Sequence, residues 1–262
     1  AIESVLAQTY EDFELVIIND GSTDNSGKMV ASYLFDERVR YIYQENRGFS
    51  AAINRGIKES RGNLIGFIGQ DDLWMPNKLE LQVKYLIEHK DIDLIHSAFF
   101  IIDSKGNLIR VKDAKIPETH SKGKFIEELF LERNFIGFET VLVRKRCFNE
   151  VGLFDERMVG FSDFDMWLRI AGCFNIEHIN IPLVEKREHE DQLSKLRAEA
   201  VINDEFLIVK KAIERYPFLK RVERKYLSSL YYLLGITLLQ KGNKKKAKQK
   251  FVKAIKCQPW KL

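Results

Sequence analysis

Cysteine, proline and long apolar runs are all scarce in this chain of 262 residues. Its three cysteines, Cys147, Cys173 and Cys257, lie far apart and form no C-x-x-C pair, which excludes a zinc knuckle and a disulfide scaffold. We therefore expect a reducing, cytosolic setting. With only five prolines and 15 glycines, and with 45% hydrophobic and 31% charged residues, the composition excludes collagen-like and disordered classes.

No stretch reaches the roughly 18–20 uninterrupted apolar residues that a membrane-spanning helix needs. The most apolar stretches, Ile92–Ile102 and Tyr226–Leu239, are interrupted by polar residues and are better explained as buried core elements. The sequence has neither an initiator methionine nor a signal-peptide pattern. We therefore expect any targeting segment to lie outside it.

Charge is distributed unevenly along the chain. Residues 191–262 carry 18 Lys/Arg and six Asp/Glu, a net charge of +12, which leaves a net charge of −8 for residues 1–190. This asymmetry predicts two units that join near residue 190. A basic tail can bind an anionic membrane, a nucleic acid or an acidic partner, or can simply be a solvated helix face, and charge alone does not distinguish these.

Short β-branched runs alternate with helical patterns over the first 110 residues. The alternation predicts an α/β architecture whose mostly parallel sheet is covered by helices on both faces. The expected strands are Leu15–Ile18, Val39–Tyr43, Asn63–Ile68 and Asp93–Ile102, and the expected helices are Asn25–Leu34, Gly48–Glu59 and Lys78–Glu88. The chain opens on an amphipathic helix, Ala1–Thr9, so we expect the first strand of such a sheet to be missing from this sequence.

The second half of the chain is predicted to be less regular, and then wholly helical. The expected helices are Phe125–Leu131 and Asp163–Ile170, and the expected strands are Thr140–Val143 and Ile176–Ile181, the second ending at Pro182. From Asp191 onward the pattern is helical to the end of the chain.

Polar residues follow three consecutive predicted strands, which is where ligands bind in open α/β sheets. Asp20 follows the first strand, Arg47 the second, and Asp71 and Asp72 the third. The adjacent carboxylates of Asp71 and Asp72 repel each other and invite a divalent cation such as Mg²⁺ or Mn²⁺. The alternative is that Asp72 only caps the next turn.

Asp163 and His189 are two further candidates. Asp163 lies in the first turn of a predicted helix, where the positive helix end stabilises an ionised carboxylate, so it is either an N-cap or a general base near a reacting hydroxyl. His189 lies between a predicted strand and the helical tail, in a loop that can present a ligand, although a lone histidine is more often structural.

Five motifs, in this order, resemble the GT-A fold glycosyltransferases of family 2 from Ala1 to about Ser194. They are ESVLAQTYEDFELVIINDGSTDNS, ENRGFSAAINRGI, FIGQDDLWMPNKL, ETVLVRKRCFNEVGLFDE and FSDFDMWLRI. The resemblance implies a Rossmann-like GT-A domain over residues 1–190. It also implies metal-dependent, inverting transfer of a sugar from a nucleotide sugar, most commonly a UDP sugar, to a hydroxyl of a glycan or lipid-linked acceptor.

The same resemblance implies a role for each candidate residue. Asp163 would be the general base, Asp20, Arg47 and Asp71 would bind the nucleotide sugar, and Asp72 and His189 would hold Mn²⁺ or Mg²⁺.

Two residues beside these candidates depart from the family pattern. Gly69 stands where an aspartate is common, and Ser162 stands where glutamate is more usual. Together with the missing first strand, these departures keep open an alternative, a non-catalytic protein with a GT-A-like fold and a helical interaction tail. A nucleotidyltransferase is disfavoured because its Gly-rich phosphate loop is absent, and no nucleic-acid partner is expected.

The helical tail carries a second resemblance. Residues 228–261 resemble a single 34-residue tetratricopeptide repeat, with helices about Leu227–Gln240 and Lys244–Lys256. Because a solenoid needs about three repeats, we expect this hairpin to pack on the rest of the chain or to form a homodimer contact. Residues 241–262 hold nine basic and no acidic residues, so we expect a cytoplasmic protein that can bind the inner face of the membrane peripherally.

Overall fold

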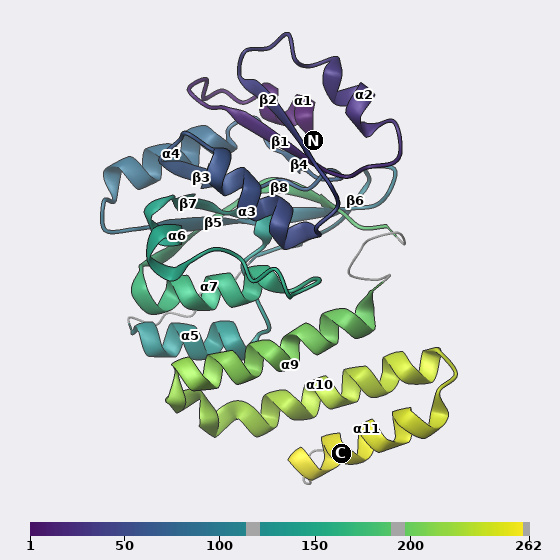
Figure 1. Cartoon of the computed structure of the whole chain (residues 1–262). Helices are drawn as coiled ribbons and strands as arrows, with labels where there is room; N and C mark the ends of the chain where they lie inside the picture. Colours follow the sequence, from purple (N-terminus) through teal and green to yellow (C-terminus); the bar gives the residue numbers. More distant parts are fainter. Residues whose placement is uncertain (114–120, 190–196, 259–262) are drawn as a thin grey trace.

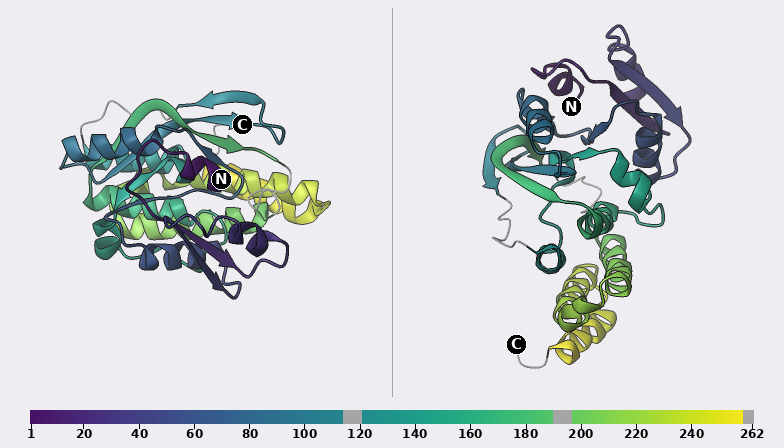
Figure 2. Two further views of the ribbon diagram at one scale, coloured as in Figure 1. Left: turned by 90° about the horizontal axis from the view of Figure 1, so that it is seen from above. Right: turned by 90° about the vertical axis from the view of Figure 1, so that its left-hand side faces the viewer.

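The chain forms an α/β part at one end and a stack of helices at the other (Figure 1). The computed structural model describes residues 1–113, 121–189 and 197–258. The right-hand view of Figure 2 shows the helices of the C-terminal part extending away from the sheets, with the first helix (purple) and the last helix (yellow) at opposite ends of the molecule. The predicted α/β class with a C-terminal helical appendage is confirmed.

A separate two-stranded sheet lies near the start of the chain. Strands β1 (Leu15–Asp20) and β2 (Val39–Gln44) are parallel, with Asp20 beside Gln44. The helices around them are α1 (Ile2–Leu6), α2 (Ser26–Ala31) and α3 (Phe49–Glu59). Helix α3 contacts β1, where Gly56 lies near Ile18, and its buried Ser50 and Asn54 donate hydrogen bonds to the segment of residues 154–162. Because the strands are parallel, the polar residues that follow them meet at one edge.

The second sheet has six strands and is curled (Figure 1). Its strands are β3 (Leu64–Gly66), β4 (Leu73–Trp74), β5 (Leu94–Ile102), β6 (Leu108–Lys112), β7 (Leu142–Arg144) and β8 (Ile176–Arg187). Their order is β3-β7-β5-β8-β4, with β6 pairing with β5 beside that path. Central strand β5 is almost entirely buried, as its continuous apolar run predicts.

The strand pairing is mixed, where the sequence predicted mostly parallel pairing: four of the six pairings among the described strands are antiparallel. Only β1–β2 and β5–β8 are parallel, whereas β3–β7, β4–β8, β5–β6 and β5–β7 are antiparallel. Strands β5 and β6 are joined by a short turn at Gly106, whose φ is +90°, and so short a connection can only return the chain antiparallel. Strands β4 and β6 were not predicted, because each is too short or too exposed to show a strand pattern.

Strand β8 continues through Pro182, where the sequence predicted that it would end. Pro182 lies opposite Ala98 at a shift of register between β5 and β8, so the absent proline N–H falls at an irregularity of the ladder. The longer strand reaches Arg187 and brings residues 186–189 to the loop that holds Asp71 and Asp72.

Helix α7 forms much of the core of the α/β part. The helices of this part beyond β3 are α4 (Lys78–Glu88), α5 (Lys122–Leu131), the unpredicted α6 (Arg146–Val151), and α7 (Ser162–Cys173). Phe164, Met166, Trp167 and Ile170 of α7 are fully buried in the largest apolar cluster. A side chain in the first turn of α7 is therefore held on a rigid element.

The C-terminal helices share that apolar cluster. They are α9 (Ala198–Arg215), α10 (Lys220–Gln240) and α11 (Lys244–Cys257). Ile208 of α9 and Leu230 of α10 belong to the same cluster as α7. The predicted boundary at residues 190 and 191 lies outside the described residues. None of the described helices has the combination of length and apolarity that crossing a membrane requires.

Helices α10 and α11 form the predicted hairpin. They approach closely at Gly235, where an added Cβ atom would lie 2.5 Å from Cε1 of Phe251. The outer face of α11 exposes its lysines, while Ala247 and Ala254 are buried against α10. That the hairpin is a tetratricopeptide unit stays a prediction, and residues 259–261 of the predicted unit lie outside the described residues.

Candidate active site

Asp20 fixes the loop that follows β2. Its Oδ1 accepts hydrogen bonds from Nε2 of Gln44 at 2.7 Å and from the backbone N–H of Arg47 at 2.9 Å, while Oδ2 accepts from the N–H of Gly48 at 2.9 Å. Gly21 lies against this loop, because an added Cβ atom there would be 2.7 Å from the backbone nitrogen of Asn46. The structure thus brings the predicted pair Asp20 and Arg47 together. Their contact with a nucleotide sugar stays a prediction.

The guanidinium of Arg47 extends from this loop toward solvent. Its side chain is 65% exposed and forms an ion pair of 3.2 Å with Oε2 of Glu156. Oε1 of Glu156 accepts a hydrogen bond of 3.0 Å from Nδ2 of Asn54 on α3. Glu156 therefore orients the guanidinium of Arg47, which stays largely exposed.

The end of β8 holds the loop that carries Asp71 and Asp72. Oδ1 of buried Asp72 accepts a hydrogen bond of 2.9 Å from the backbone N–H of Arg187, and the carbonyl oxygen of Asp71 accepts one of 3.1 Å from Arg187 Nε. Nε2 of His189 lies 3.3 Å from Oδ2 of exposed Asp71. The structure thus places the predicted metal ligand His189 beside Asp71, and Asp72 one residue away.

A lysine and a third acidic residue complete this group. Nζ of Lys186 lies 3.1 and 3.3 Å from the two carboxylate oxygens of Glu139, which is buried on the short turn η1 (Phe138–Thr140). Burial, and then the negative charge of Glu139, raise the pKa of Asp72 to about 7. Burial alone would lower the pKa of Lys186, but the charges of Glu139 and Asp72 outweigh it and raise that pKa.

Asp163 lies in the first turn of α7, near the same group. Its Oδ1 accepts a hydrogen bond of 2.8 Å from the backbone N–H of Phe164, and Oδ2 accepts one of 2.9 Å from Nδ2 of Asn134. Desolvation raises the pKa of Asp163 to about 6, although these two hydrogen bonds and the charge of Lys186 oppose the rise. A carboxylate with a pKa near 6 is ionised at neutral pH and still accepts a proton readily.

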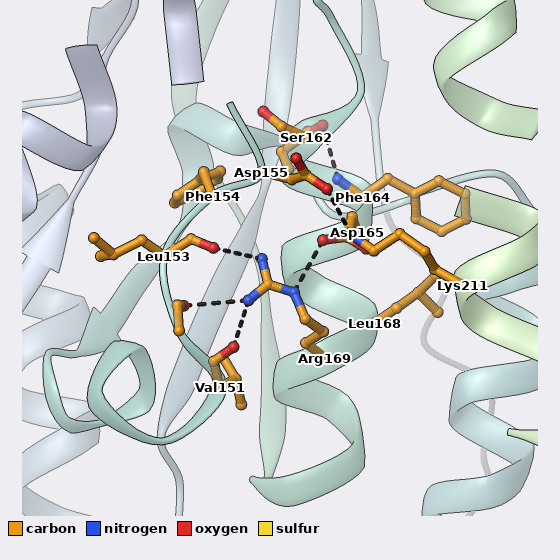
Figure 3. A network of polar contacts seen from close by, with 12 residues as sticks. Val151, Leu153, Phe154, Asp155, Ser162, Phe164, Asp165, Leu168, Arg169 and Lys211 are labelled. Atoms are coloured by element: carbon orange, nitrogen blue, oxygen red, sulfur yellow. Dashed lines mark hydrogen bonds and ion pairs between the residues drawn. The ribbon is translucent and has the colours of Figure 1, made fainter. Parts of the chain in front are cut away.

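Helix α7, whose first turn carries Asp163, is fixed by a network of polar contacts (Figure 3). Arg169 donates to the carbonyl oxygens of Val151, Gly152 and Leu153 and pairs with Asp165 at 2.9 Å. Lys211 of α9 contacts Oδ1 of Asp165 at 2.7 Å and Oδ2 of Asp155 at 3.0 Å. A helix from the C-terminal part therefore helps to hold both α7 and the loop that precedes it.

Comparison with known proteins identifies the family. Residues 1–151 match the family described as Glycosyl transferase family 2, and this match covers more than half of the chain.

The chain belongs to glycosyl transferase family 2.

Relatives and solved structures agree with this family 2 assignment. A protein of Rickettsia felis named an uncharacterized glycosyltransferase is 35% identical over 199 residues, which are 74% of this chain and 32% of that protein. S. aureus TarS, solved in complex with UDP-GlcNAc, aligns with a TM-score of 0.67 at 16% identity over 97% of this chain and 76% of that one.

A mannosyltransferase, PcManGT from Pyrobaculum calidifontis, was solved with GDP-Man and Mn²⁺. It aligns with a TM-score of 0.60 at 13% identity, over 99% of this chain and 82% of that one. These structural likenesses establish the GT-A fold of the family 2 chain. The chain spans about a third of the length of the Rickettsia felis protein.

The C-terminal part also matches a second family. Residues 183–262 match the family described as Anaphase promoting complex subunit 8 / Cdc23. This match covers under a third of the chain and overlaps the last strand of the α/β part.

The residues at the family 2 site have donor atoms that suit a divalent cation. Among the residues that the structure describes, no three His, Cys, Asp or Glu side chains are arranged to hold a metal ion by themselves. Asp71, Asp72 and His189 nevertheless supply carboxylate and imidazole donors at one place, and Mg²⁺ or Mn²⁺ bound with a diphosphate needs only one or two protein carboxylates. The residues fit a cation that is shared with a nucleotide ligand.

Sequence reasoning assigned no role to Glu139, Lys186, Asn134 or Glu156. Glu139 could have been found, because it is the one charged residue in the apolar run from Phe135 to Val143. A carboxylate buried in such a run needs a charged or hydrogen-bonding partner. The other residues carried no local signal, since their partners lie 29 to 109 residues away along the chain.

Proposed function

We propose that this family 2 chain is a divalent-cation-dependent, inverting glycosyltransferase that transfers a sugar from a UDP sugar to a hydroxyl of a glycan or lipid-linked acceptor. The observation that carries the proposal is the partly buried carboxylate of Asp163, whose pKa is raised to about 6, near Lys186 and Glu139, whose charges also act on Asp72. The nucleotide sugars bound to TarS and PcManGT support a nucleotide-sugar donor.

Asp163 accepts the proton of the acceptor hydroxyl in this proposal. The hydroxyl oxygen forms a bond with the anomeric carbon as the bond from that carbon to the diphosphate oxygen breaks, so the configuration inverts. The nucleoside diphosphate leaves with the electron pair of the broken bond, and the proton remains on Asp163 Oδ1 or Oδ2. Proton acceptance by a positioned carboxylate contributes typically about 10²–10⁴-fold to such a reaction.

The donor would be held by the loops that follow the strands. Arg47, which is exposed and positively charged, would attract the diphosphate, and Asp20 would hold the loop that bears Arg47 in place. Asp72 and His189 would hold Mn²⁺ or Mg²⁺, which supplies positive charge to the departing diphosphate, and Asp71, beside His189, would bind the donor sugar. Lys186 would limit the repulsion between Glu139, Asp72 and Asp163.

Release of nucleoside diphosphate tests this function. The chain is incubated with UDP-GlcNAc, UDP-glucose and GDP-mannose in turn, with Mn²⁺ or with EDTA, and free UDP or GDP is measured. We expect cation-dependent release from one of the UDP sugars. The same donors are tested for binding by calorimetry, and for release with oligosaccharide and lipid-linked acceptors present. A chain that binds a donor but releases no UDP or GDP would favour the non-catalytic alternative.

The basic face of α11 supports a second proposal, a peripheral contact with an anionic membrane. Lys244, Lys245, Lys248 and Lys256 are exposed, and Val252 lies exposed among them with 41% of its surface accessible. A helix face that mixes lysines with an apolar side chain suits the surface of an anionic bilayer, where each lysine contributes about 1 kcal/mol.

A further inference from the structure

Two adjacent acidic residues on α9 reach the two segments that surround Asp163. Asp204 and Glu205 are buried, at 7% and 1% exposure, although α9 belongs to the C-terminal helical part. Buried carboxylates are costly unless fully hydrogen-bonded. Both of these residues have specific partners close to the first turn of α7.

Asp204 holds the chain just before that turn. Its Oδ2 accepts hydrogen bonds from the backbone N–H groups of Val159 at 2.7 Å and Gly160 at 2.8 Å. These residues precede Asp163 by four and three positions. The approach is close, because a Cβ atom added at Gly160 would lie 2.6 Å from Cγ2 of Val201, also on α9.

Glu205 holds the segment on the other side of Asp163. It binds the guanidinium of Arg133 with both oxygens, and Oε2 accepts the hydroxyl hydrogen of Tyr226 at 2.8 Å. Arg133 and the next residue, Asn134, have φ values of +55° and +66°. Two successive non-glycine residues in the left-handed region need strong surrounding contacts to persist.

Asn134 in turn touches the proposed base directly. Its Nδ2 donates to Oδ2 of Asp163 at 2.9 Å, and its Oδ1 accepts from the backbone N–H of Ile136 at 3.2 Å. The side-chain amide is therefore oriented at both ends. The contacts form one continuous chain from Glu205 through Arg133 and Asn134 to the carboxylate.

We infer that Glu205 is a positioning residue for the transfer reaction, which acts through Arg133 and Asn134 to fix the carboxylate of Asp163 toward the acceptor hydroxyl. Asp204 supports the same carboxylate by fixing the start of α7. This inference rests on the proposed function, in which Asp163 is the base. It makes the C-terminal helices part of the catalytic apparatus, because without α9 both segments around Asp163 lose their buried partners.

The test compares Glu205→Gln and Asn134→Gly with the unaltered chain and with Glu214→Gln. Glu205→Gln keeps the shape of the side chain and removes its charge. Asn134→Gly removes the amide that donates to Asp163, and glycine adopts the left-handed conformation of residue 134 easily. This variant therefore tests the contact with Asp163 even if Glu205→Gln folds poorly. Glu214 lies on the same helix, is 65% exposed and pairs only at 4.0 Å with Lys210, which makes it the matched control.

We expect kcat to fall about 10- to 100-fold in Glu205→Gln and Asn134→Gly, with the KM and Kd for the donor unchanged, because a misplacement of about 1 Å can cost about 100-fold. The acidic limb of the pH–rate profile should also move to higher pH, since the Asn134 hydrogen bond lowers the pKa of Asp163. Lys186 on β8 and Glu139 on η1 face the same carboxylate and are unchanged in these variants. Glu214→Gln should behave as the unaltered chain.

Asp163→Asn, measured in parallel, separates failure of the inference from failure of the proposed function. If Asp163→Asn loses turnover while Glu205→Gln and Asn134→Gly keep their kcat and pH profile, the positioning role is wrong and the base stands. If Asp163→Asn keeps its turnover, the base is wrong and the positioning role falls with it.

Discussion

The carboxylate of Asp72 lies directly against Gly69. A Cβ atom added at residue 69 would be 2.8 Å from Oδ2 of Asp72, whose other oxygen accepts the backbone hydrogen bond of Arg187. The family pattern commonly has an aspartate at this position, and here its absence leaves room for the Asp72 side chain. The glycine at residue 69 thus allows the Asp72 carboxylate to lie in its present position.

Removing the Asp72 carboxylate should weaken donor binding that depends on a cation. We expect Asp72→Ala to raise the Kd for UDP in the presence of Mn²⁺ by about 10- to 100-fold, because the diphosphate charge is then less well compensated. Isothermal titration calorimetry measures the effect. Asp91→Ala, which removes an exposed carboxylate before β5, is the control. Identical titrations of the unaltered chain and Asp72→Ala would rule out a metal role for Asp72.

Adding a methyl group at residue 69 should disturb the same site without removing a charge. Gly69→Ala is expected to displace the Asp72 carboxylate and to weaken Mn²⁺-dependent UDP binding less than Asp72→Ala does. Gly56→Ala is the matched control, because its Cβ atom would lie at an ordinary 3.6 Å from Cγ1 of Ile18. If Gly69→Ala binds UDP as tightly as Gly56→Ala, Asp72 does not need its present position.

Local patterns in the sequence predicted most elements but few of their contacts. Helix α4 was predicted with both of its bounds, and β5 within one residue, because each has an unbroken periodic or apolar pattern. The continuation of β8 past Pro182 depends on a register shift against β5, which a local pattern does not contain. The sequence likewise indicated Asp71, after a predicted strand, and His189, in a loop, but their proximity joins residues 118 positions apart.

The ionisation of Asp163 should cost the folded chain stability above about pH 6. Burial raises the pKa of Asp163 from 3.8 in the unfolded chain to about 6 in the folded chain. The protonated form therefore stabilises the fold fully below pH 3.8, and this contribution is lost as the pH rises through about 6. We expect Asp163→Asn to have a higher Tm than the unaltered chain near pH 8, and a smaller difference near pH 4. A difference in Tm that does not change with pH in thermal unfolding would show that the pKa of Asp163 is not raised by folding.

The membrane proposal predicts binding to vesicles that depends on charge and salt. The chain should sediment with phosphatidylserine-containing vesicles at low salt, remain in the supernatant at high salt, and not bind pure phosphatidylcholine vesicles. The double substitution Lys245→Glu and Lys248→Glu on α11 should abolish sedimentation. Lys58→Glu with Lys90→Glu, which changes two exposed lysines of the α/β part, should not. Sedimentation lost equally in both variants would show that only net charge matters.

In the proposed reaction Asp163 takes the proton of the acceptor hydroxyl, and Asp163→Asn tests this role. The substitution keeps the size of the side chain and removes its ability to accept a proton. With a donor and an acceptor that the unaltered chain uses, we predict that kcat falls about 10²–10⁴-fold while the Kd for the donor, measured by calorimetry, stays unchanged. Turnover at the unaltered rate would show that Asp163 is not the base and only accepts hydrogen bonds from Phe164 and Asn134 in the first turn of α7, whose N-cap is Phe161.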